Sequence, residues 1–356
     1  MSESILRVFT AFSGYDSQCM ALDNLNIKYD LVGWSEIDKY AIIAHNLIYP
    51  KYKDRNYGDI SKIDWCQVPD FDLFTYSSPC QDFSVLGNQK GGNEGSGTRS
   101  SLLWECRKAI LAKKPKYLIL ENVEALVTKK FINLFNEWIS ELGDYGYTSY
   151  WEVLNSKNYG IPHSRNRVFL VSILRENDND FPLFNFPKEI ELKTKLVDLL
   201  ERNVDEKYYL SEEILDKYFY VERESNKAYY KDKEVRPNET FYWNTSLNFA
   251  DESVKGDICK CLKTDNAVAI LERTIKCVDN GTNVYDYRIR KLTPKECFRL
   301  MGVNEKNIDI IQNSNQISEN QQHKLAGNSI VVDVLEHLFR KLLIDKNNDY
   351  GSKALF

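Results

Sequence analysis

Apolar runs of strand length alternate with helical stretches over the first 175 residues of the chain. Short β-type runs occur at 6–12, 29–36, 72–78, 116–120 and 168–174, and helix-favouring segments lie between them at 17–25, 38–47, 101–113 and 131–142. Alternation of this kind predicts a mixed, mainly parallel sheet with helices on both faces. We therefore expect an α/β domain that binds its ligands beyond the carboxyl ends of the strands.

The pattern changes near Phe184. Residues 188–285 are polar, charged and rich in tyrosine, with turn signals such as RPNET and DNGTN, and they predict a smaller, irregular second domain. Helical spacing of apolar residues returns at 329–343, and such a helix needs a core to pack on. The sequence thus predicts a first domain at 1–187, a second at 188–285, and a segment at 286–356 that returns to the first.

Composition narrows the class of protein. The chain has 356 residues, of which 43% are apolar and 28% charged, so it is globular rather than disordered or fibrous. No apolar run approaches the ~18 residues that span a bilayer, and the first residues lack a signal sequence. Eight cysteines are dispersed and only four histidines are present, so we expect reduced thiols, no metal site and a cytoplasmic location.

The net charge of −5 weighs against a nucleic-acid partner when taken for the whole chain. Basic residues nevertheless gather locally at 107–116, 164–167 and 288–299. An acidic protein with such clusters is able to present one basic cleft.

The turn FTAFSGYD follows the first predicted strand and contains Gly14, which lets a ligand approach the backbone. Glu36 ends the second strand, 22 residues further on, and Asp59 lies in the same region. An acidic residue at this distance binds ribose hydroxyls in dinucleotide folds. The three residues predict an adenosine-containing cofactor, although a glycine in such a turn is also common without any ligand.

Cys80 follows Pro79 at the carboxyl end of a predicted strand, where a side chain points into the cleft. Glycines at 87, 91, 92, 95 and 97 come after it, and they predict a mobile loop that serves as a lid. A buried structural cysteine fits poorly beside such a polar, glycine-rich segment.

Six motifs in order resemble those of the DNA cytosine-5 methyltransferases of bacteria and phages. They are FSGYD at 12–16, SPCQ at 78–81, ENV at 121–123, SRNR at 164–167, RKLTPKECFRLMG at 290–302 and GNS at 327–329. The resemblance covers nearly the whole chain and implies a Rossmann-like S-adenosylmethionine-dependent domain. Asp16 stands where the family often has a second glycine, and His163 stands where glutamine usually precedes the paired arginines.

The resemblance implies a chemistry for five residues. A thiolate at Cys80 adds to cytosine C6 and makes C5 nucleophilic. Glu121 hydrogen-bonds ring N3 and the exocyclic amine, and Asn122 organises the site. Arg165 faces cytosine O2 or a phosphate, and Arg167 braces the site.

The same resemblance implies the cofactor and the DNA contacts. S-adenosyl-L-methionine, which leaves as S-adenosyl-L-homocysteine, is expected against Phe12, Ser13, Gly14, Glu36, Ile37, Asp59, Ile60, Ser77, Pro79, Leu102, Asn328 and Ser329. A target base in duplex DNA must be flipped out to reach Cys80. The loop at 82–101 is expected to close over it, with Leu86 as a wedge. DNA contacts are expected at Gln81, Ser84, Leu86, Lys90, Arg99, Lys263 and Arg290.

Residues 188–285 correspond to the family's target-recognition domain, which reads the DNA sequence. Cys261 and Leu262 stand where the family usually has a Thr-Leu pair; a zinc half-site at 259–261 is the other interpretation, but it lacks partner ligands. We expect a monomer in a bacterial or phage-infected cell, acting on double-stranded DNA, with a cognate restriction endonuclease as a separate protein.

Three other functions compete with this one. An RNA cytosine-5 methyltransferase of the same fold would use the same chemistry on a tRNA, but its short Cys-Phe-Thr signature is absent. A nicotinamide oxidoreductase would explain Gly14 and Glu36 but has no use for SPCQ and ENV. A non-catalytic DNA-binding regulator would not need Cys80, Glu121 and Arg165 together.

Overall fold

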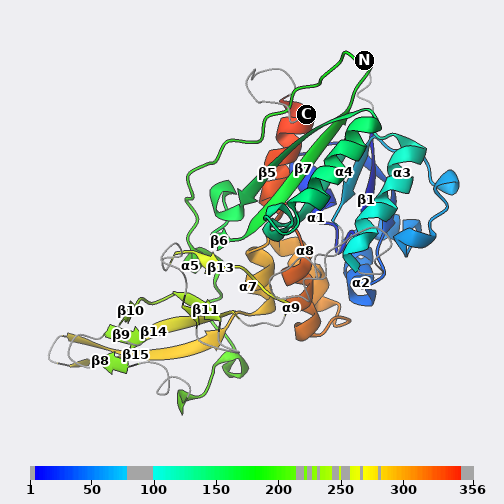
Figure 1. Ribbon diagram of the computed structural model, residues 1–356. Coiled ribbons are helices and arrows are strands. Elements are labelled where there is room, and N and C mark those ends of the chain that lie inside the picture. The colour runs from blue at the N-terminus through cyan, green and yellow to red at the C-terminus, as the bar shows by residue number, and fades with distance from the viewer. Residues whose placement is uncertain are drawn as a thin grey trace.

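A mixed six-stranded sheet forms the centre of the described part of the chain (Figure 1). The computed structural model describes residues 5–77, 99–213, 220–222, 227–230, 233–242, 248–249, 257–264, 268–279 and 282–345. The strands are β1 (Leu6–Ala11), β2 (Tyr29–Ser35), β3 (Leu73–Tyr76), β4 (Tyr117–Val123), β5 (Tyr147–Asn155) and β7 (Asn166–Leu174). Their order is β2-β1-β3-β4-β7-β5, and only β7 is antiparallel to both its neighbours. The expectation of a mixed, mainly parallel sheet is confirmed.

Helices cover both faces of this sheet. On one face lie α1 (Ser17–Asn24), α2 (Lys39–Ile48) and α10 (Val332–Phe339), and on the other lie α3 (Cys106–Lys113) and α4 (Ile132–Asp144). Successive strand residues point to opposite faces, so Val8 packs in the first layer and Phe9 in the second. The apolar runs in the sequence reflect strands that are buried on both sides.

Two elements differ from the sequence-based expectation. The helix expected at 101–113 begins as a 3-10 helix at Arg99–Glu105 and becomes α-helical only at Cys106. The edge strand β5 was not expected, because the polar residues Thr148, Ser149 and Glu152 interrupt its apolar positions. An edge strand has one neighbour only, so its sequence need not be apolar throughout.

Between Phe184 and Leu292 the described residues form mainly small antiparallel sheets, which are preceded by the short helix α5 (Leu196–Leu199) and a 3-10 helix at Glu206–Tyr208. One sheet contains β8 (Tyr220–Glu222), β9 (Lys227–Tyr230) and β10 (Lys233–Val235), and another contains β11 (Thr240–Tyr242), β12 (Asn248–Phe249), β14 (Val268–Asp279) and β15 (Thr282–Lys291). The β14–β15 hairpin extends away from the central sheet (Figure 1). The boundary expected at residue 285 falls inside β15, which continues to Lys291, shortly before the C-terminal helices begin.

One short strand joins the two parts. β13 (Cys259–Lys260) pairs in parallel with β6 (His163–Ser164), which lies immediately before β7 of the central sheet. Backbone hydrogen bonds therefore tie the polar region to the paired-arginine motif.

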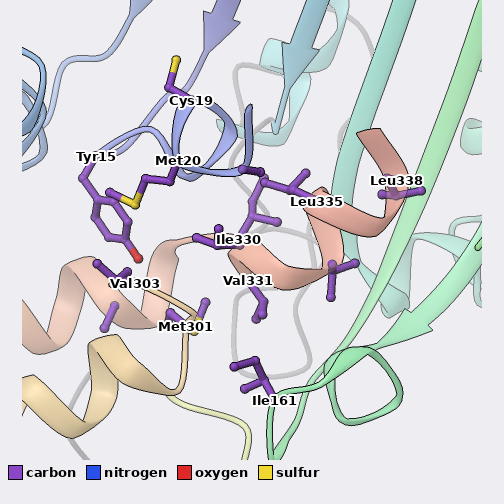
Figure 2. Close-up of a cluster of buried hydrophobic side chains, with 14 of the residues drawn as sticks. Tyr15, Cys19, Met20, Ile161, Met301, Val303, Ile330, Val331, Leu335 and Leu338 are labelled. Atoms are coloured by element: carbon purple, nitrogen blue, oxygen red, sulfur yellow. The ribbon is translucent and has the colours of Figure 1, made fainter. Parts of the chain in front are cut away.

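The C-terminal segment packs against the first helix of the chain. After β15 come α7 (Pro294–Arg299), α8 (Glu305–Asn313), α9 (Glu319–Asn328) and α10, which ends in a π-helical turn at Arg340–Ile344. Figure 2 shows Met20 of α1 beside Ile330, Val331 and Leu335, all within one buried cluster. Within the described ranges, no helix is both long and apolar enough to cross a membrane.

Candidate active site

The motifs meet at one edge of the central sheet. Phe12–Gly14 follow β1, Glu36 follows β2 and Ser77 follows β3, while Glu121 lies near the carboxyl end of β4. Because β7 is antiparallel, its amino end and the preceding Arg165 lie at this same edge. The chain leaves β1 for β2 on one side and then crosses to β3 on the other, which makes this edge the topological switch point where α/β folds bind ligands.

The Glu36 carboxylate organises the loops after β1 and β2. One oxygen accepts a hydrogen bond from the Gly14 backbone N–H at 3.0 Å, and the other accepts from the N–H groups of Ile37 and Asp38, both at 2.8 Å. The backbone of Glu36 is held in turn by the Asn56 side-chain amide. These bonds bring the two loops together at the switch point.

Asp16 occupies a position with the left-handed backbone conformation that favours glycine, with φ of 70°. Both oxygens of its carboxylate accept hydrogen bonds. One caps α1 by accepting from the Cys19 N–H at 3.2 Å, and the other accepts from the Thr10 hydroxyl at 2.9 Å. Capping offsets part of the backbone strain. The structure thus explains how an aspartate is accommodated in this backbone conformation.

The surface beside Glu36 fits an adenosine group. The Ser13 hydroxyl is buried and, within the ranges that the structure describes, has no hydrogen-bond partner, and space is open around the Cα of Gly14, whose φ is 60°. Ile37 is 71% exposed, although it is a large apolar residue next to a carboxylate. A ribose hydroxyl would donate to the Glu36 carboxylate. A flat ring such as adenine would pack against Ile37 or the half-buried Phe12.

Other residues expected at the cofactor lie nearby with different contacts. The Asp59 carboxylate accepts from the backbone N–H and hydroxyl of Ser61 at 3.0 and 2.8 Å, and these bonds hold its pKa below the usual value. Ile60 is buried, and Leu102 is half-buried against the core on the α3–α4 face. Asn328 is exposed at the end of α9.

Glu121 and Asn122 are buried near the end of β4. The Glu121 carboxylate lies 3.1 Å from Nε of Arg167, its β7 neighbour. Burial raises the pKa of Glu121, and Arg167, Arg165 and a hydrogen bond with Ser77 only partly oppose this rise. The result is a carboxyl group that holds a proton more readily than a free glutamate does.

Arg165 is 3% exposed and clamps three segments together. Its Nη2 donates to the carbonyls of Gly327 and Ser329 at 3.0 and 2.9 Å, and Nη1 lies 3.5 Å from the Leu262 carbonyl. Nε is buried and has no hydrogen-bond partner among the described residues, so one donor of this guanidinium remains for a bound group.

Several expected site residues lie outside the described residues. They are Pro79, Cys80, Gln81, Ser84, Leu86 and Lys90. The backbone of Arg99 opens the 3-10 helix before α3. Lys263 is half-buried, and its backbone passes so close to Gly327 that a Cβ there would lie 2.8 Å from it.

The expectation that Arg290 contacts DNA is wrong. Its side chain is fully buried and forms salt bridges with Glu272 at 2.6 Å and Glu296 at 2.7 Å. A guanidinium enclosed by two carboxylates is not available to a phosphate. Arg290 instead fastens the β14–β15 hairpin to α7.

Two bridging residues carry no signal in the sequence. The ring of His163 lies 3.1 Å from the Leu300 carbonyl at Nδ1, and Nε2 accepts from the Leu262 backbone N–H at 3.0 Å. The Tyr15 hydroxyl donates to Ser329 across more than 300 residues of sequence. Both residues join the terminal motifs to the first ones, and only the folded chain reveals the pairing.

Known proteins resemble this chain over nearly its whole length. It is 37% identical to the type II methyltransferase M2.ScrFI of Lactococcus lactis subsp. cremoris, in an alignment that covers 95% of this chain and 99% of that protein. It is 31% identical to the orphan methyltransferase M.SPRI of Bacillus phage SPR, covering 95% and 97%.

Solved structures share the fold. Dnmt2 methyltransferase of S. pombe has a TM-score of 0.63 at 20% identity and covers 96% of this chain and 100% of its own. A putative DNA modification methyltransferase from an E. coli prophage has a TM-score of 0.59 at 16% identity, covering 95% and 99%.

The sequence profile of the C-5 cytosine-specific DNA methylases matches residues 6–343. This match does not favour a nicotinamide oxidoreductase, a non-catalytic regulator or an RNA methyltransferase. The chain therefore belongs to the C-5 cytosine-specific DNA methylase family, and its enzyme class is that of the DNA cytosine-5 methyltransferases.

Proposed function

We propose that this enzyme transfers a methyl group from S-adenosylmethionine to C5 of a cytosine flipped out of duplex DNA, through a covalent bond between Cys80 and C6. The observation that supports it most is the convergence of Glu121, Arg165 and Arg167 at the same edge of the sheet as the Glu36 loop, which follows β2.

The residues beside Glu36 would hold the cofactor. Glu36 would accept from the ribose hydroxyls, Ser13 offers its unpaired hydroxyl, and Ile37 and Phe12 present apolar surface to the adenine. S-adenosylmethionine supplies an electrophilic methyl group when bound. Asp59 would accept a hydrogen bond from the adenine amine, since its side chain is 35% exposed and thus open to a ligand.

Glu121 is suited to act as a proton-holding group for the base. In its protonated form it donates a hydrogen bond to ring N3, which stabilises the charge that develops as Cys80 adds to C6. Its raised pKa keeps that proton available. The free Nε of Arg165 is suited to donate to cytosine O2.

The proposed reaction proceeds by addition, methyl transfer and elimination. The Cys80 thiolate gives its electron pair to C6, and C5 would then take the methyl group as the bond between that carbon and the cofactor sulfur breaks, which leaves S-adenosylhomocysteine. Loss of the C5 proton to a base restores the C5–C6 double bond and expels Cys80 as a thiolate. Asn122, buried next to Glu121, would hold the strand end in place.

Trapping with 5-fluorocytosine tests the role of Cys80. A duplex made with 5-fluorocytosine in place of every cytosine contains all possible targets, and fluorine cannot leave C5 as a proton does. With S-adenosylmethionine present, the wild-type protein should form an adduct that survives a denaturing gel. Cys80→Ser should form none, while the exposed Cys66→Ser should behave as wild type. An adduct in Cys80→Ser, or none in wild type bound to this duplex, would contradict the proposal.

The remaining expectations from the sequence stand as proposals. We propose that residues 188–285 select the DNA sequence, that the 82–101 loop closes over the flipped base with Leu86 as a wedge, and that Lys263, Arg99 and the loop residues contact DNA. The enzyme would act as a cytoplasmic monomer, and the type II relative supports a restriction-modification setting, with a restriction endonuclease as a separate partner where one exists. Bisulfite sequencing of DNA from cells that express the protein would identify the sequence it reads.

A further inference from the structure

Cys261 lies where the recognition region meets the catalytic edge. It follows β13, whose Cys259 and Lys260 pair with His163 and Ser164 just before Arg165. Its Sγ lies 3.7 Å from Nη1 of Arg165. Cys261 is therefore part of a cluster built from two distant segments.

The cluster has an excess of buried positive charge. Arg165 is almost completely buried, and Arg167 lies close enough to disfavour a second positive charge. Three of the four hydrogen-bond contacts of the Arg165 guanidinium in the described part of the chain are to carbonyl oxygens, which carry only partial charges. A buried guanidinium needs a full counter-charge. Besides Glu121, the sulfur of Cys261 is the group that favours the charged form of Arg165.

Glu121 is a poor counter-ion during the proposed reaction. To donate to N3 it must be protonated, and it is then neutral at the step that depends on Arg165. An anion that does not exchange protons with the base would keep the guanidinium in place throughout.

We propose that Cys261 is held as a thiolate that serves as the counter-ion of Arg165, and that it is a positioning residue for this arginine. The proposal rests on the function proposed for Glu121 and Arg165. Cys261 touches neither base nor cofactor in this assignment, and acts only through the guanidinium.

The electrostatic surroundings support this assignment. Burial opposes ionisation of Cys261, but the charge of Arg165, together with the neighbouring His163 and Arg167, outweighs it and lowers the pKa of Cys261 to about 5. Neighbouring Cys259 is fully buried away from these arginines, and burial raises its pKa. The titratable and charged groups around Cys261 are His163 on β6, Arg165 and Arg167 at β7, Glu121 on β4, and Cys259, Lys260 and Lys263 on its own segment.

The protonation state of Cys261 is measurable without any catalytic assay. Intact protein is treated with limiting iodoacetamide between pH 6 and 8, and alkylation at the Cys261 peptide is followed by mass spectrometry, with free cysteine in the same solution as the reference. From pH 8 to pH 6 the alkylation rate of an ordinary thiol of pKa ~8.5 falls roughly 75-fold, because the thiolate fraction falls by that factor. The Cys261 rate should change less than twofold. A fall that parallels free cysteine would overturn the proposal.

The positioning role is tested by Cys261→Ser and Cys261→Thr, with Cys66→Ser as the matched control. Removing the thiolate leaves Glu121 as the remaining anion beside Arg165. The guanidinium then favours the ionised form of Glu121 more strongly, and the pKa of Glu121 falls. The alkaline limb of the single-turnover methylation rate should therefore move to lower pH in both variants and stay in place in the control. A uniform loss of rate with an unchanged pH profile would show a merely structural cysteine.

The two experiments separate the two proposals. If wild type fails to form the 5-fluorocytosine adduct but Cys261 alkylates independently of pH, the proposed catalytic roles fail and the thiolate stands. If the adduct forms and Cys261 titrates as an ordinary thiol, the thiolate proposal fails alone.

Discussion

Replacing Arg290 by methionine should destabilise the protein rather than weaken its contact with DNA. Nε donates to Glu272 at 2.6 Å, and the two Nη groups donate to Glu296 at 2.7 and 2.8 Å. Glu296 also accepts from the backbone N–H groups of Thr293 and Glu201, so it holds three chain segments together. Removing the guanidinium leaves a fully buried carboxylate without its counter-ion.

The size of the effect follows from this burial. Breaking a buried ion pair by removing one partner costs about 3 to 5 kcal/mol, because the remaining charge is uncompensated. At roughly 2 °C per kcal/mol for a chain of this length, the melting temperature should fall by about 6 to 10 °C. An exposed arginine contributes much less, since surface substitutions usually stay within about 0.5 kcal/mol.

Thermal and urea unfolding of Arg290→Met measure the change, with Arg273→Met as the matched control. Arg273 is exposed on β14, the strand that pairs with β15. DNA binding by the folded variant should keep the wild-type dependence on salt concentration. Wild-type stability together with a salt slope shallower by about one would show that Arg290 contacts a phosphate, and would refute the buried role.

Three further predictions follow from other sites. Glu36→Ala should weaken binding of S-adenosylhomocysteine roughly 10- to 150-fold in calorimetry, since a charge-assisted hydrogen bond contributes ~1.5 to 3 kcal/mol; unchanged affinity would remove Glu36 from the pocket. Gly327→Ala should cost about 1 to 3 kcal/mol in urea unfolding, because its Cβ would lie 2.8 Å from the Lys263 backbone, whereas Gly143→Ala, with open space around it, should not destabilise. Burial, with a smaller contribution from a neighbouring carboxylate, raises the pKa of Asp333 to about 7, so wild type should lose stability as pH rises from about 4 to 7. Asp333→Asn should show a flatter stability profile over that interval, and an equal slope in both proteins would contradict this.

The sequence alone determined the fold class and the candidate catalytic residues. Strands buried on both faces require continuous apolar runs, and helices that cover them require one apolar side, so the alternation of the two is visible in the chain itself. Each motif is local in sequence, and those around Gly14, Glu121 and Arg165 each occupy a loop or strand end at one edge of the sheet. Their order along the chain was enough to indicate the family.

Only the tertiary structure decided what the basic residues and cysteines do. Arg290 and Arg165 lie in similar basic segments, yet two glutamates enclose one, and backbone carbonyls with a sulfur surround the other. Likewise Cys259 and Cys261 are two residues apart, but one has a raised pKa and the other a lowered pKa. Charge, burial and proton affinity depend on neighbours from distant segments, such as His163 against 261–262 and Gly327 against Lys263. No local pattern records these neighbours, because folding brings them together.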